Sequence, residues 1–108
     1  MPERSYFVYL DDDNSIFVYF ETTQGVVSSF VVKYLAKIDD EEFEVLRFDS
    51  AHEVPHVDIL DPEGNTRQKI WLSHLDNGLA LDFSQEDIKQ HYHSYRERFI
   101  QWKNSKNP

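Results

Sequence analysis

The apolar residues of this chain follow two different periods, and this change limits the folds that the chain can adopt. Through roughly the first two thirds, short apolar and aromatic segments alternate with polar residues and are separated by turn-forming residues, which is typical of antiparallel strands. We expect about five to six strands, at residues 6–10, 15–21, 26–38, 43–49, 57–60 and 68–72. The alternation in the longest of them places five apolar side chains on one face: Phe30, Val32, Tyr34, Ala36 and Ile38.

The C-terminal part of the chain has the period of a helix. Five large apolar side chains recur at intervals of four and three residues and therefore share one helical face: Ile88, Tyr92, Tyr95, Phe99 and Trp102. Ser84-Gln85-Glu86-Asp87 resembles a capping box, so we expect the helix to begin at Ser84. Residues 104–108 are without an apolar side chain and end in proline, and we expect them to fray.

Together these patterns predict an α+β fold, an antiparallel meander sheet with one long C-terminal helix packed on one face. With 108 residues and no stretch of linker composition, we expect residues 1–108 to form a single domain. The first hairpin is apolar on both faces, in residues 6–9 and 16–20. Because one helix covers only one face, we expect a homodimer through this aromatic hairpin, or another protein on it.

Composition excludes several classes of function. The chain has 20 acidic and 11 basic residues, a net charge of -9, which opposes binding to DNA and anionic membranes and disfavours RNA, but suits a basic protein partner. The absence of cysteine excludes disulfides, cysteine zinc fingers, iron–sulfur clusters and thiol nucleophiles. No export signal or membrane-spanning run is visible, so we expect a cytoplasmic protein, and no motif calls for a cofactor.

The predicted helix carries a line of basic side chains. Lys89, Arg96 and Lys103 are spaced by seven residues and follow one flank of the apolar stripe. In one interpretation the aliphatic parts of these side chains cover the core, and their charged groups pair with acidic residues of the strands. In the other they form a phosphate-binding strip.

The densest polar cluster lies between residues 47 and 58, and it predicts acid–base chemistry. In this hypothesis His52 and His56 exchange a proton, Arg47 holds a phosphate, and Asp49 or Asp58 orients a histidine, which is the set needed for metal-independent cleavage of RNA. It requires these side chains to converge on one pocket beside the basic helix flank.

Two other interpretations of the same cluster stay open. His56 and Asp58 are two residues apart on a strand and share a side, and with His52 they form a two-histidine, one-carboxylate set for a metal. No HExxH motif specifies hydrolase chemistry. Alternatively, the cluster has a purely structural role. Its hydrogen bonds and ion pairs then hold the strands together in an acidic, dimeric protein-interaction module.

The same residues carry a resemblance to known proteins. The run Arg47-Phe48-Asp49-Ser50-Ala51-His52, then Pro55-His56-Val57-Asp58, and a helix with Asp87-Ile88 and Tyr92 or Tyr95 resemble short, mostly uncharacterised prokaryotic proteins. The style of the motif is similar to that of the TumE-type toxin family of toxin–antitoxin systems. The resemblance implies a small bacterial or archaeal cytoplasmic protein, encoded beside a regulatory partner.

Overall fold

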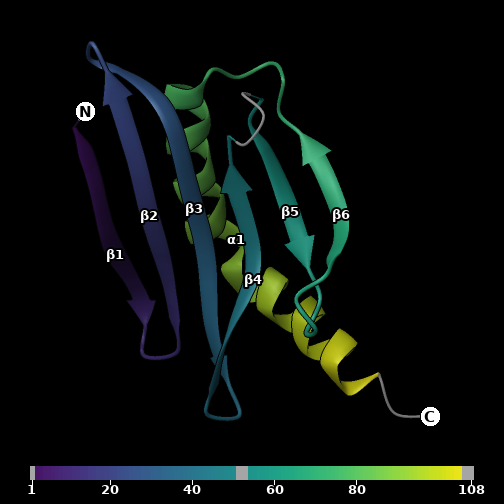
Figure 1. Ribbon diagram of the computed structural model, residues 1–108. Coiled ribbons are helices and arrows are strands. Elements are labelled where there is room, and N and C mark those ends of the chain that lie inside the picture. The colour runs from purple at the N-terminus through teal and green to yellow at the C-terminus, as the bar shows by residue number, and fades with distance from the viewer. Residues whose placement is uncertain (1, 51–53, 106–108) are drawn as a thin grey trace.

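Within residues 2–50 and 54–105, the part of the chain that the computed structural model describes, six strands form one antiparallel sheet and one helix packs on it (Figure 1). The strands lie side by side in chain order, so every neighbour in space is a neighbour in sequence. The elements are β1 (Glu3–Asp11), β2 (Asn14–Thr23), β3 (Val26–Ile38), β4 (Glu41–Asp49), β5 (His56–Leu60), β6 (Thr66–Trp71) and α1 (Asn77–Asn104). The predicted α+β meander is confirmed.

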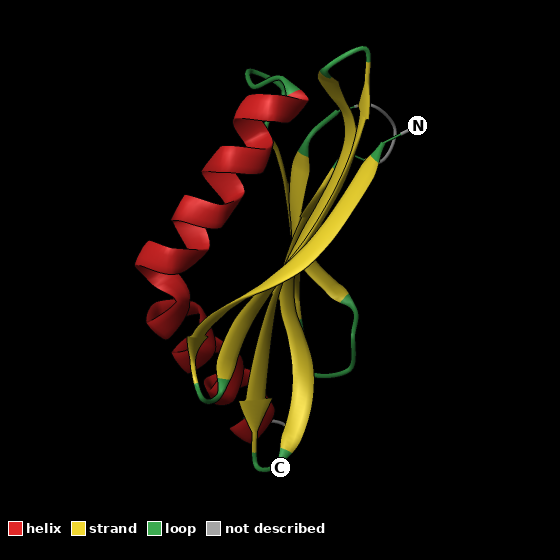
Figure 2. Ribbon diagram, turned by 90° about the vertical axis from the view of Figure 1, so that its left-hand side faces the viewer, coloured by secondary structure: helices red, strands yellow, loops and turns green. Residues whose placement is uncertain are grey.

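The core lies between the sheet and α1. The five side chains of β3 that the alternation assigned to one face, from Phe30 to Ile38, are all buried. α1 packs mainly against β3 and β4, with the ring of Tyr92 against Tyr34 and that of Phe99 against Phe43. Seen from the side, the helix is a separate layer on one side of the twisted sheet (Figure 2).

A buried polar link ties α1 to the middle of the sheet. The Tyr34 hydroxyl donates to Asn14 Oδ1 at 2.5 Å, and Arg96 Nη1 from α1 donates to the same oxygen at 3.1 Å. Burial raises the pKa of Tyr34, although the Arg96 guanidinium opposes the rise. The hydroxyl therefore stays protonated and can donate to Asn14.

The helix begins earlier than the sequence predicted. Its N-cap is Asp76, whose Oδ1 accepts a hydrogen bond from the Leu79 N–H at 2.8 Å. Ser84 lies inside the helix, fully buried, with its hydroxyl donating to the Leu81 carbonyl at 2.8 Å. The prediction failed because Asp76-Asn77-Gly78 has the composition of a loop, whereas an aspartate before a helix is also a strong cap. Residues 106–108 of the expected frayed tail lie outside the described residues.

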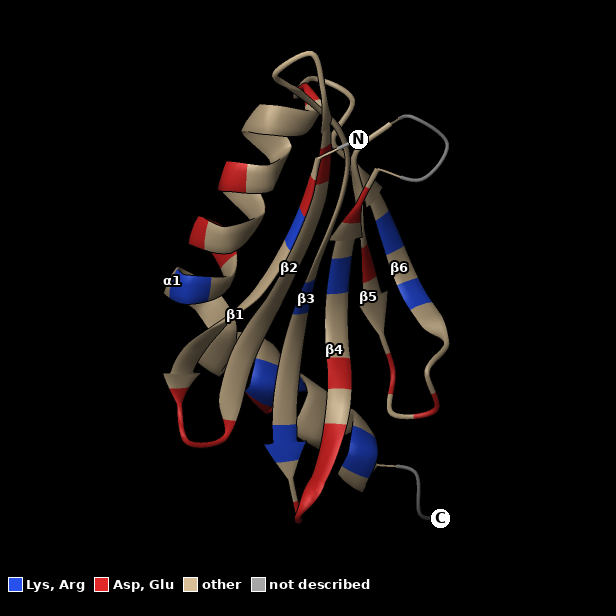
Figure 3. Ribbon diagram, turned by 60° about the vertical axis from the view of Figure 1, so that its left-hand side comes forward, with Lys and Arg blue, Asp and Glu red and all other residues tan. Residues whose placement is uncertain are grey.

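The face of the sheet turned away from α1, here called the outer face, is not covered by any element in the described part of the chain. Directly paired residues form a row across it from β1 to β6: Phe7, Phe17, Lys33, Arg47, Asp58 and Lys69. The row is aromatic on β1 and β2 and charged on β3 to β6, where basic segments on β4 and β6 flank an acidic one on β5 (Figure 3). Among the described residues, no helix combines the length and the apolar character needed to cross a membrane.

The capping role of Asp76 can be tested by substitution. Asp76→Ala removes the acceptor for the Leu79 N–H, so we expect the free energy of unfolding in urea to fall by about 1 kcal/mol. Asp82→Ala, which removes an exposed carboxylate from the interior of the same helix, is the control and should change it by less than about 0.5 kcal/mol. Equal effects of the two substitutions would contradict a cap at Asp76.

Candidate functional site

Strand pairing gathers four of the five predicted catalytic residues on the outer face. Asp49 on β4 pairs with His56 on β5, and Arg47 pairs with Asp58 one step further along. Because side chains alternate along a strand, all four lie on the same face, while Leu46 and Phe48, which alternate with Arg47 and Asp49 on β4, point toward α1. His52, the other predicted catalytic residue, lies outside the described residues.

His56 is the centre of this cluster. Its Nε2 lies 3.0 Å from Asp49 Oδ1 and 3.5 Å from Asp58 Oδ2, and its Nδ1 lies 3.0 Å from the Val54 carbonyl oxygen. A carbonyl oxygen only accepts hydrogen bonds, so Nδ1 carries a proton and donates it to Val54. Nε2 is therefore the atom left to interact with the two carboxylates.

The cluster is closed off from solvent. His56 is 2% exposed, and Asp49 and Asp58 are each 8% exposed. The Trp71 ring on β6 lies 5.1 Å from the His56 ring, centroid to centroid. Lys69 Nζ forms an ion pair with Asp58 Oδ1 at 3.3 Å, without the alignment of a hydrogen bond. The ammonium group of Lys69 thus partly balances the negative charge of Asp58.

Arg47 lies on the same outer face, but its guanidinium contacts Glu44 and not the His56 cluster. Its Nε donates to Glu44 Oε2 at 2.6 Å, and Lys33 Nζ lies 3.6 Å from the other oxygen of Glu44. The structure therefore brings Asp49, His56 and Asp58 together and pairs Arg47 with its own strand.

The three basic residues of the predicted phosphate-binding strip lie on α1, on the opposite side of the sheet, and each has a polar partner there. Arg96 also donates to the Lys37 carbonyl at 2.9 Å, Lys103 Nζ lies 3.2 Å from Asp39 Oδ2, and Lys89 Nζ lies 3.9 Å from Glu86 Oε2. The expectation that this flank and the polar cluster meet in one pocket is therefore wrong, because β4 and β5 turn the cluster away from α1. Phosphate binding by Lys89, Arg96 and Lys103 stays a prediction.

Two residues of the site were missed from the sequence. Lys69 and Trp71 flank the cluster because β6 pairs with β5, Asp58 with Lys69 and His56 with Trp71. A regular hairpin closed at Leu60 and Thr66 would pair Asp58 with Gln68 instead. The irregularity between Ile59 and Leu60 shifts the register by one residue, and nothing in the sequence signals this shift.

Chemically, the cluster offers one imidazole nitrogen and two carboxylates to a shared point. One ligand atom from each of Asp49, His56 and Asp58 lies within 4.8 Å of the other two. Such a set can hold either a proton on Nε2 or a cation between the three side chains.

The mutual dependence of these groups predicts a large effect of one substitution. His56→Leu leaves two buried carboxylates facing each other, so we expect the free energy of unfolding to fall by about 3 kcal/mol in urea denaturation. His74→Leu, at an exposed loop position, is the matched control and should cost less than about 0.5 kcal/mol. A small effect at His56 would show that the carboxylates do not depend on it.

Comparison with known proteins places the chain in one family. No curated protein and no solved structure matches it. The model of a family described as a domain of unknown function, DUF7718, matches residues 1–105, which include all six strands and α1. The chain therefore belongs to the DUF7718 family.

Proposed function

We propose that this domain binds a divalent transition-metal ion, Zn²⁺ in the first place, through Asp49, His56 and Asp58. The observation that carries the proposal is the convergence of three ligand atoms, one nitrogen and two oxygens, within 4.8 Å. Nitrogen and oxygen ligands of this kind suit Zn²⁺.

The spacing of the ligand atoms supports this ion. Bonds of about 2.0–2.1 Å in a tetrahedral arrangement separate ligand atoms by about 3.3 Å. The distances from His56 Nε2 to the carboxylate oxygens of Asp49 and Asp58 are 3.0 Å and 3.5 Å, one on each side of that value. The two carboxylate oxygens lie within 4.8 Å of each other, and rotation of the side chains to a similar spacing would complete the arrangement.

The surroundings of the three ligands support it too. Histidine ligands of metals usually donate their second N–H to a carbonyl or a carboxylate, and His56 Nδ1 does so to Val54. Lys69 pairs with Asp58 Oδ1, so that Oδ2 is the oxygen turned to His56. Both contacts orient the ligands toward a common centre.

A bound ion would join two strands. Asp49 ends β4 and His56 begins β5, and the chain between them passes through residues 50–55. An ion shared by both strands would fix this connection, and burial of the ligands suits a stabilising ion better than one that meets a large substrate. The function that the geometry supports best is therefore the binding of a metal ion that links β4 to β5 and stabilises the fold.

The ribonuclease hypothesis, with its link to toxin–antitoxin systems, makes different demands on the same residues. A general acid or base must reach the substrate, and His56 is 2% exposed. The Arg47 guanidinium is held by Glu44 rather than directed at a phosphate. RNA cleavage stays a prediction, and cleavage that survives EDTA and is lost in His56→Gln would favour it over the metal.

The metal proposal predicts a gain of stability. Zn²⁺ at 100 times its dissociation constant should raise the free energy of unfolding by about 2.7 kcal/mol, measured by urea denaturation of tag-free protein after treatment with EDTA. Acid should abolish the gain, because a histidine ligand must be neutral to bind a metal.

Isosteric variants separate the site from unspecific binding. Asp49→Asn and Asp58→Asn keep the shape of the ligands but remove their charge, and we expect each to weaken Zn²⁺ binding in calorimetry by at least about tenfold. Glu63→Gln, an acidic residue in the exposed turn between β5 and β6, should leave the affinity unchanged. Equal affinity in all of these proteins, or no binding to the wild type, would refute the proposal.

Self-association is a second candidate function, carried by the aromatic part of the outer face. Phe7 and Tyr9 on β1 are 50% and 76% exposed, although both are large aromatic residues. The Phe7 ring contacts Phe17 at 5.2 Å and Tyr9 at 6.0 Å between centroids, which makes a continuous aromatic surface. We propose that a second copy of the chain covers it.

This dimer can be dissociated by surface substitutions. Phe7→Ser with Tyr9→Ser removes the exposed rings, and we expect sedimentation velocity to show a dimer for the wild type and a monomer for this variant. Val26→Ser, at a site 67% exposed at the other end of the sheet, should leave the dimer intact. A monomeric wild type at high concentration would contradict the proposal.

A further inference from the structure

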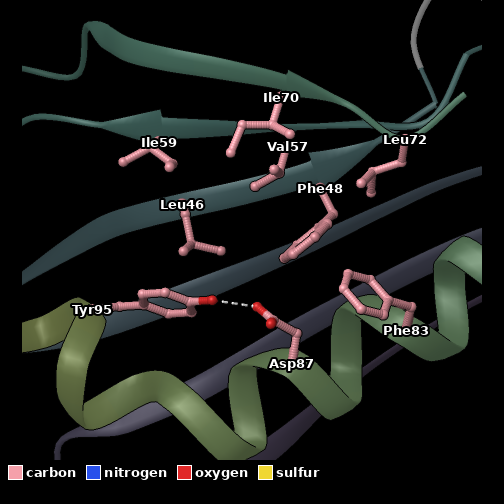
Figure 4. Close-up of a pocket in the computed structure, with 9 residues that line it drawn as sticks. All are labelled: Leu46, Phe48, Val57, Ile59, Ile70, Leu72, Phe83, Asp87 and Tyr95. Atoms are coloured by element: carbon pink, nitrogen blue, oxygen red, sulfur yellow. Dashed lines mark hydrogen bonds between the residues drawn. The ribbon is translucent and has the colours of Figure 1, made fainter.

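A cavity lies between α1 and the end of the sheet formed by β4, β5 and β6 (Figure 4). The helix packs closely on β3 and crosses the sheet at an angle, so it leaves part of β5 and β6 without a direct cover. The volume of the cavity is about 190 Å³. It lies on the face opposite to the His56 cluster and is independent of it.

The walls of the cavity are apolar. Five buried side chains of the sheet side line it: Leu46, Phe48, Val57, Ile59 and Leu72. Ile70 from β6 and Phe83 from α1 also line the cavity and are 41% and 44% exposed, so they form its rim. An apolar cavity of about 150 Å³ can hold a benzene molecule, so this one has room for a single aromatic ring.

One charged group lies in this apolar lining. Asp87 and Tyr95 point from α1 toward the sheet, and the Tyr95 hydroxyl donates to Asp87 Oδ2 at 2.5 Å. Burial and the bond to Asp87 raise the pKa of Tyr95, so the hydroxyl remains a donor at neutral pH. A carboxylate can accept several hydrogen bonds, and a neutral donor such as the Tyr95 hydroxyl brings no positive charge to Asp87.

A basic residue of α1, Arg98, lies beside Tyr95 but outside the cavity. The Arg98 guanidinium lies over the rings of Tyr95 and Trp102, 5.4 Å and 5.3 Å from their centroids. It is not part of the cavity lining. The charge that the cavity itself offers to a ligand is therefore the negative charge of Asp87.

We propose that this cavity binds a small aromatic amine, in which a short chain joins one ring to a primary ammonium group. The ring fills the apolar part between β5 and α1, and the ammonium donates to Asp87. The net charge of -9 favours the approach of such a cation, and the size of the cavity limits the ligand to about one ring.

The test uses 2-phenylethylamine as the probe and two matched molecules as controls. In NMR titrations of the full chain, we expect the amine to shift the resonances of Val57, Leu72 and Ile70 in a saturable manner. The anion 3-phenylpropionate and the neutral 2-phenylethanol have similar rings and should bind at least about tenfold more weakly, since neither can donate a charge-assisted hydrogen bond to Asp87.

Variants then locate the binding. Asp87→Asn should weaken binding of the amine by at least about tenfold, while Glu86→Gln, the same loss of charge at the adjacent exposed position, should change it by less than about twofold. Ile70→Trp fills the cavity from its exposed rim, and we expect it to abolish binding with the circular dichroism spectrum unchanged.

Three outcomes would overturn the proposal. The first is that the wild type shows no saturable shifts with the amine. The second is that Asp87→Asn and Glu86→Gln weaken binding equally, which would indicate attraction to the acidic surface alone. The third is that the anion binds as well as the amine, which would remove the role of the carboxylate.

Discussion

The burial of alternate side chains of β3 under α1 is the constraint on which the rest of this structure depends. β3 is the longest strand and lies inside the sheet, so its buried face, from Phe30 to Ile38, anchors both the helix and the strands on either side. Each large apolar side chain buried in this way contributes about 1.5–3 kcal/mol to folding. Once α1 is held there, the position of every other apolar residue follows from the register of the strands.

The same constraint leaves the outer face to be stabilised by its own side chains. On β1 and β2 the rings of Phe7 and Phe17 contact each other, and on β4 to β6 ionisable side chains pair between strands, His56 with Asp49 and Lys69 with Asp58. The His56 cluster is one of these pairings between strands. It is buried by neighbouring side chains, although no element in the described part of the chain covers this face. Its burial makes the balance of charge there decisive for stability.

Much of the fold could be predicted because it depends on local patterns. The alternation of β3, the turns around Asp11–Asp13 and residues 61–65, and the helical spacing from Ile88 to Trp102 each identify an element without knowledge of the others. The first residue of α1 could not be predicted from a local pattern. Asp76 can begin a helix or a turn, and the choice depends on Ala80 and Leu81, which are buried in the core.

The candidate sites differ in how far the sequence reveals them. That His56 and Asp58 share a side follows from strand alternation, but the contact with Asp49 requires the register between β4 and β5. The cavity at Asp87 and Tyr95 depends on the angle at which α1 crosses the sheet, which no residue pattern gives. A chain that pairs each strand with the next also has consequences for its synthesis. Its hairpins can form in the order in which they are made, as contacts close in sequence favour rapid folding. α1 follows all of them, so the apolar face of β3 stays uncovered until the helix has emerged from the ribosome, and in that interval the nascent sheet is open to aggregation or to a chaperone.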